Sequence, residues 1–115
     1  MKQLALAAAI LSLGAALTAH AANPEAGKEK ARTCAACHGP DGNSTAADFP
    51  KLAGQHSDYL VKAMRDYKSG ARKNAIMAPL VANLTVRDFE DIAAYYAHQQ
   101  GLVTRKSSYF ARDQH

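Results

Sequence analysis

The chain lacks an apolar run long enough to cross a membrane. The stretch from Leu4 to Leu17 is almost wholly Ala, Leu and Ile, but its 14 residues fall short of the ~18 that a membrane-spanning helix needs. Lys2 precedes it and the small pair Ala19 and Ala21 follows it. This pattern is typical of a secretory signal peptide, and it fits an uncleaved membrane anchor less well. We therefore expect residues 1–21 to be removed after Ala21 and the remainder to be exported to the periplasm, with no membrane span.

Large apolar side chains are also scarce in the part that would remain. Only 14 of the 94 residues after Ala21 are Leu, Ile, Val or Phe. The net charge of that part is only +3, from 13 basic and 10 acidic residues, so the composition does not indicate disorder. Because so small a core stabilises a fold weakly, we expect a disulfide, a metal or a bulky cofactor inside it. This composition argues against an enzyme with a large buried site of its own.

There are only two cysteines, Cys34 and Cys37, and both lie in the segment Cys34-Ala35-Ala36-Cys37-His38. A disulfide across two residues closes almost no loop and would stabilise little. A zinc site would lack a fourth ligand, and a thioredoxin-like pair would need a sheet, whereas no stretch here alternates with period two. The C-x-x-C-H pattern instead favours covalent haem attachment, in which both thiols add to porphyrin vinyl groups and His38 is the proximal ligand. A redox dithiol and a simple disulfide remain as alternatives.

The rest of the sequence predicts an all-α chain of three main helices joined by long loops. We expect the first helix over 24–36, the second over 57–68, and the third from Thr85 to Gly101, with Thr85 and Asp88 forming a capping box. The segments 39–50 and 71–83 are expected to be loops, the second because it contains Pro79.

Two methionines after Ala21 could ligate an iron. Met64 lies on the apolar face of the predicted second helix, where methionine usually fills a core. Met77 lies in the loop predicted around Pro79, and loops commonly present ligands. The neighbouring residues are apolar, so we expect this loop to pack over a bound group, and Met77 is the better candidate. Met64 as ligand, or an open iron, are the alternatives. His56 and His98 fit surface histidines better than ligands, and His20 would leave with the signal peptide.

These features together resemble a class I c-type cytochrome, and in particular one domain of the small bacterial periplasmic dihaem cytochromes c. The resemblance covers nearly all of Gly27 to Gln100, and it is carried by the segments 34–39, 50–55, 59–60, 72–79 and 92–97. It implies a small cytochrome c fold over 22–100 wrapped around one covalent haem c, followed by a polar tail over 101–115.

The resemblance also implies roles for individual residues. Cys34 and Cys37 would form the thioether bonds, and His38 would be held by the backbone carbonyl of Pro50. Gly27 would let the first helix cross close to the last, against Tyr95 or Tyr96.

A haem iron held by His38 and Met77 has no vacant position, which suits a one-electron carrier and not an enzyme. The segment Lys51–Lys73 carries six basic and two acidic residues, so we expect redox proteins with an acidic patch to dock there, beside an exposed haem edge. The same charges also fit an ordinary solvated helix.

We expect a monomer and no nucleic-acid partner. The alternatives are a subunit docked on a dehydrogenase or oxidase through a tail containing Tyr109 and Phe110, and a ligand-binding or peroxidatic protein with an open distal side.

Overall fold

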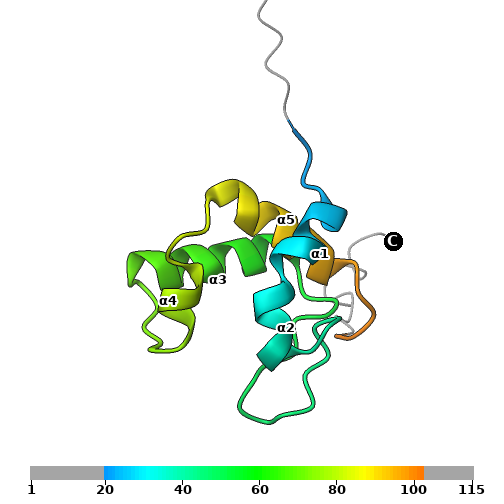
Figure 1. The fold of residues 1–115 in the computed structure, drawn as a ribbon, viewed down its shortest axis with the longest axis horizontal. Coiled ribbons are helices and arrows are strands. Elements are labelled where there is room, and N and C mark those ends of the chain that lie inside the picture. Colours follow the sequence, from blue (N-terminus) through cyan, green and yellow to red (C-terminus); the bar gives the residue numbers. More distant parts are fainter. Residues whose placement is uncertain (1–19, 103–115) are drawn as a thin grey trace, which may run out of the picture.

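The computed structural model describes residues 20–102, and within this range all regular secondary structure is helical, with no strand (Figure 1). The helices are α1 (Pro24–Lys30), α2 (Arg32–His38), α3 (Ser57–Ser69), α4 (Met77–Val81) and α5 (Val86–Ala97). A long loop over 39–56 joins α2 to α3, and a shorter segment over 70–76 joins α3 to α4. The predicted all-α class is confirmed. The predicted signal segment, apart from His20 and Ala21, and the predicted tail beyond Leu102 lie outside the described residues.

The first predicted helix is present but divided. Asn23 caps α1, because its side-chain oxygen accepts the backbone N–H groups of Glu25 and Ala26. At Ala31 the backbone leaves helical geometry (φ −78°, ψ 0°), so α2 begins as a separate helix. α2 continues through His38, two residues beyond the predicted end, and Gly39 ends it with φ +85°. Both cysteines and the histidine therefore lie on one short helix.

α1 crosses α5 at Gly27, where a side chain would not fit. A Cβ atom built on Gly27 would overlap the backbone carbonyl of Asp91 and lie 3.0 Å from the backbone nitrogen of Ile92. The close crossing expected at this glycine is confirmed. Its partner is the backbone of Asp91 and Ile92, one helical turn before the predicted Tyr95 or Tyr96.

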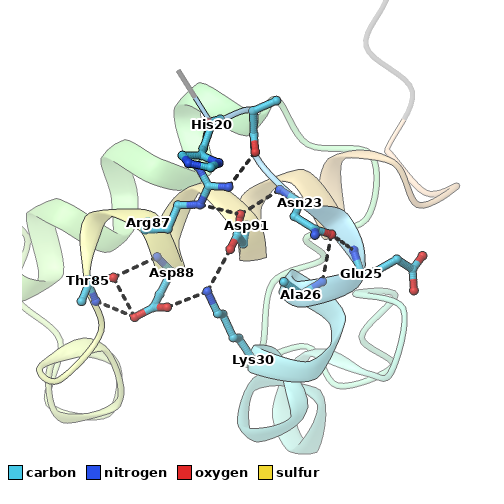
Figure 2. A network of polar contacts seen from close by, with 10 residues as sticks. His20, Asn23, Glu25, Ala26, Lys30, Thr85, Arg87, Asp88 and Asp91 are labelled. Atoms are coloured by element: carbon cyan, nitrogen blue, oxygen red, sulfur yellow. Dashed lines mark hydrogen bonds and ion pairs between the residues drawn. The ribbon is translucent and has the colours of Figure 1, made fainter. Parts of the chain in front are cut away.

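A network of charges holds this crossing together (Figure 2). The buried carboxylate of Asp91 accepts the backbone N–H of Asn23 and the ammonium of Lys30, each at 2.8 Å, and lies 3.3 Å from Nε of Arg87. Burial raises the pKa of Asp91, but these donors outweigh burial, and the net shift of its pKa is downward. Lys30 also pairs with Asp88 at 2.7 Å. Two further nitrogens of Arg87 donate to the carbonyl oxygens of His20 and Ala21, so the chain is anchored to α5 ahead of α1.

α3 lies against α5, and α4 lies beside α3 (Figure 1). The capping box predicted at α5 is confirmed, since the side chains of Thr85 and Asp88 each bond the other's backbone N–H. The prediction of a loop over 71–83 is confirmed for 71–76 and 82–83 but wrong for 77–81, because α4 forms around Pro79. Proline is tolerated there as the third helical residue, since the first backbone N–H groups of a helix need no intrahelical partner.

The core is small, as the composition indicated. Its main cluster joins α1, α3 and α5 through Ala31, Leu60, Ile92, Ala93 and Tyr96. α5 ends at Ala97 rather than at the predicted Gly101, and Gly101 instead lies close against Ala53 in the 39–56 loop. None of the helices in residues 20–102 is long and apolar enough to cross a membrane.

Candidate haem site

A cavity of about 310 Å³ opens between the helices, which is within the range of small-molecule and cofactor sites. All four residues predicted to hold the cofactor line it: Cys34, Cys37, His38 and Met77. Apolar side chains from α3, α4 and α5 complete the walls, among them Leu60, Leu80, Val81 and Ile92. The fold thus brings the C-x-x-C-H segment and the methionine segment, which are far apart in the sequence, to one enclosed space.

His38 is held in place by two contacts from the 39–56 loop. The side chain is buried, and its Nδ1 lies 2.8 Å from the carbonyl oxygen of Pro50. Because a carbonyl oxygen only accepts, Nδ1 carries the proton, and in a neutral ring the lone pair is then on Nε2. The ring of Phe49 stands edge-on to the imidazole, 6.4 Å between centroids. The hydrogen bond to Pro50 that the resemblance implied is therefore present, and it leaves the lone pair of Nε2 free to bind a metal.

The two thiols lie three residues apart on α2 and are free in the structure. Both are half-buried and line the cavity. Burial raises the pKa of the Cys34 thiol, so it is protonated at neutral pH. Among residues 20–102 no group of three or more His, Cys, Asp or Glu side chains gathers to hold a metal ion. In this part of the chain the two thiols and His38 do not form the closed ligand set that zinc requires.

Tyr96 contributes a buried polar group to the same cavity. Its ring is almost completely buried, and within the described residues its hydroxyl makes no well-aligned hydrogen bond, its polar neighbour being the Cys34 thiol. Burial, followed by the neighbouring Cys34 thiol, raises the pKa of this hydroxyl. A buried hydroxyl without a well-aligned partner is costly, so its presence here indicates a cavity that is meant to be filled.

Two methionines reach the cavity from different elements. Met77 is the first residue of α4, and Met64 lies within α3. Met64 also packs against the core cluster, whereas Met77 does not. The site therefore contains both of the methionines that the sequence offered. Met64 lies on a helix and packs on the core as predicted, whereas Met77 begins α4 instead of lying in the predicted loop.

Polar side chains line the remainder of the cavity. They include Lys30, Lys51, Gln55, Arg72 and Asn74. The guanidinium of Arg72 lies over the ring of Tyr67, 4.7 Å from its centroid. Sequence reasoning missed Asn74, although an asparagine three residues before Met77 is a helix-start signal. The segment was predicted to be a loop because of Pro79, so Asn74 had no predicted helix to begin.

These observations fit a covalently bound haem. Two thiols one helical turn apart and a histidine with a free Nε2 are grouped at one wall of the cavity. α3, α4 and α5 supply apolar surface, and Met64 and Met77 supply thioethers.

Comparisons with known proteins agree with this site. A family model described as cytochrome c matches residues 24–100. The chain is 51% identical over 96 residues to cytochrome c4 of Pseudomonas aeruginosa, a match that covers 83% of this chain and 48% of that relative. It is 42% identical over 83 residues to cytochrome c-554(548) of Halomonas halodenitrificans, covering 70% of this chain and 100% of that relative.

A solved structure is similar as well. Reduced recombinant cytochrome c4 from Pseudomonas stutzeri matches with a TM-score of 0.68 and 46% identity, over 72% of this chain and 48% of that chain. This chain thus spans about half the length of the cytochrome c4 relatives and the full length of the Halomonas relative. It belongs to the cytochrome c family, and its single C-x-x-C-H segment corresponds to one covalently bound haem c.

Proposed function

We propose that this chain is a periplasmic one-electron carrier whose haem is bonded to Cys34 and Cys37 and ligated by His38 and Met77. The observation that carries the proposal is the cavity, where both thiols, the histidine and the methionine come together from α2 and α4. Removal of residues 1–21 after Ala21 and export to the periplasm are part of the same proposal, supported by the leader-like sequence.

His38 is suited to be a permanent ligand. Its Nδ1–H donates to Pro50, which fixes the ring orientation and increases the basicity of Nε2. Burial of the ring keeps water from competing for the same position.

Met77 is the better distal ligand of the two methionines. Met64 is engaged in core packing between α3 and the helices beside it, so moving it to an iron would open a hole in the core. Met77 begins a short helix whose main packing partner among the described residues is α3, and Met77 itself is not among the residues packed on the core cluster. A thioether on the iron favours the reduced state relative to a second nitrogen ligand.

The bound haem supplies the chemistry, which is the exchange of one electron at iron without a change of ligands. In this proposal the residues of the chain would bury the group, His38 and Met77 would be its two protein ligands, and no position would be left for a substrate. This arrangement supports a carrier and not an enzyme, and it argues against a ligand-binding or peroxidatic role.

Redox partners are proposed to dock on the basic region Lys51–Lys73. Lys51 and Arg72 are exposed and line the cavity, so positive charge lies beside the site of electron exchange. An acidic partner surface would be attracted to this edge, and the contact would be small and short-lived. We propose that the protein acts as a monomer.

Absorption spectra of the haem-loaded protein test the ligand assignment. The unmodified protein should show a sharp reduced α-band that carbon monoxide does not move. Met77→Ala should bind carbon monoxide, whereas Met64→Leu, a volume-conserving control, should remain closed. Carbon monoxide binding by the unmodified protein, or a closed Met77→Ala variant, would contradict the proposal.

Salt dependence tests the partner surface. Transfer to an acidic redox partner should slow as ionic strength rises, and Lys73→Glu should slow it several-fold at low salt. Lys28→Glu on α1 is the matched control, because it makes the same change of charge at an exposed residue that does not line the cavity. Equal effects of the two variants would argue against docking at this region.

A further inference from the structure

Asn74 holds the backbone of the methionine segment at Met77 itself. Its side-chain Oδ1 accepts the N–H groups of Ile76 and Met77, both at 2.9 Å. Its backbone oxygen accepts the N–H of Ala78 at 3.1 Å. Three successive amides, with Met77 in the middle, are therefore hydrogen-bonded to one residue.

The segment has few other constraints. Among the described residues, the hydrogen bonds of residues 70–82 end within the segment, on the last turns of α3 at Asp66 and Ser69, or on the nearby backbone N–H of Leu84. None of them reaches α1, α2 or α5. The position of Met77 thus depends on local contacts.

α4 also depends on an external cap. It has only five residues, and a helix this short is unstable in isolation. The residue at its formal N-cap, Ile76, has no side-chain acceptor, and the first turn contains no acidic residue. The carboxamide oxygen of Asn74 supplies the acceptor for the first backbone N–H groups that neither Ile76 nor the first turn of α4 provides.

We propose that Asn74 is the positioning residue for the distal ligand: it fixes the Met77 backbone so that the thioether remains at the iron. Asn74 does not contact the iron in this proposal; it acts through Met77. The proposal rests on the assignment of Met77 as ligand made above. Without Asn74 the ligand is still present, but the population in which Met77 has left the iron increases.

Carbon monoxide binding to the reduced, haem-loaded protein measures that population, because the gas enters only when Met77 has left. Loss of an N-terminal cap shifts a helix equilibrium by about fivefold, so Asn74→Ala should bind carbon monoxide about fivefold faster than the unmodified protein. Asn74→Asp keeps an acceptor oxygen at the same place and should restore the slow rate. Asn83→Ala is the matched control, since Asn83 is exposed in the same region and its side chain makes none of the hydrogen bonds found in residues 20–102.

The outcomes separate the two proposals. If the unmodified protein is closed, Met77→Ala is open, and Asn74→Ala binds the gas no faster than the unmodified protein, the role of Asn74 is overturned and the ligand assignment stands. The role is also overturned if Asn83→Ala has the same effect, or if Asn74→Asp fails to restore the slow rate. If the unmodified protein already binds as fast as Met77→Ala, the ligand assignment fails and the role of Asn74 fails with it.

A second measurement needs no variant. Hydrogen exchange in the unmodified protein should show the Ile76 and Met77 amides protected, although both precede the first intrahelical bonds of α4. Exchange at the rate of an unstructured peptide would overturn the proposal even if Asn74→Ala proved too unstable to study.

Discussion

The loop on the His38 side of the cavity and the segment on the Met77 side are attached to the fold in different ways. The 39–56 loop is bonded to residues at the end of α5 or just after it. Its hydrogen bonds there are Tyr95 Oη to Pro40 O at 2.7 Å, Gly54 N to Tyr96 O at 2.9 Å, Asn43 Nδ2 to Gln100 O at 2.8 Å, and Leu102 N to Ala53 O at 2.7 Å. Residues 70–82 make no comparable bond to α5 within the described part of the chain.

The difference concerns what must break before each ligand can move. Releasing the Pro50 carbonyl from His38 means separating segments that are far apart in the sequence, which is close to unfolding the domain. Releasing Met77 needs only the loss of a five-residue helix and its cap. Such local openings cost less free energy than global unfolding. The histidine side is therefore the fixed side of the site, and the methionine side is the one that small changes can open.

Two glycines give the largest test of this comparison, since each has φ near +85° and one lies on each side. A Cβ atom on Gly42 would lie 2.7 Å from Cδ1 of Tyr96 and 2.8 Å from the backbone nitrogen of Ala53. Gly42→Ala should thus lower the free energy of unfolding by about 3 kcal/mol, from the left-handed backbone and the overlap together. A Cβ atom on Gly70 would have no neighbour within 4 Å. Gly70→Ala should therefore lower the free energy of unfolding only through the left-handed backbone, by about 1 kcal/mol.

Denaturant unfolding of the reduced, haem-loaded proteins measures both values. Equal losses for the two glycines would mean that the 39–56 loop can yield around Gly42 and that the histidine side is not the more rigid one.

Acid should have the next largest effect on the free energy of unfolding, because it weakens the crossing of α1 and α5 that supports the fixed side. The hydrogen bond from Lys30 lowers the pKa of Asp88 to about 2. Because the folded pKa lies below the unfolded value of 3.8, the stabilisation is complete above that value and is lost as the pH falls toward 2. The loss should amount to about 1–2 kcal/mol.

Asp88→Asn should remove this part of the acid dependence, as followed by unfolding curves between pH 5 and 2. Asp66→Asn is the control, because Asp66 forms a surface pair with Lys62 within α3, and such pairs contribute little. If the two variants give the same acid profile, the crossing network is not the acid-sensitive element.

The sequence predicted best those features that depend on residues close together in the chain. The haem-attachment segment, the Thr85–Asp88 capping box and the bounds of α3 follow from spacing within one or two helical turns. The hydrogen bond from His38 to Pro50 spans twelve residues and was accessible only through the resemblance to a family.

Features that depend on packing were predicted poorly. The family resemblance implied that Gly27 is a crossing point, but only the packing of α1 on α5 decides that Asp91 and Ile92 lie against it. α4 was missed because a rule for proline inside a helix was applied to a proline in the first turn, where it does not hold. Asn74 became visible as a cap only after that helix was known to exist.

The substitution with the smallest expected effect tests a single hydrogen bond on the fixed side. Tyr95→Phe removes one hydrogen bond, from the tyrosine hydroxyl to Pro40 O, and should lower the free energy of unfolding by about 1 kcal/mol. Tyr59→Phe is the control, because its hydroxyl has no hydrogen bond within the described residues. Hydrogen exchange should be faster at Leu52 and Ala53, whose amides both bond to Gly42 O, and unchanged at Met77. Faster exchange at Met77 as well would show that the two sides open together, and the distinction between a fixed and an openable ligand would then fail.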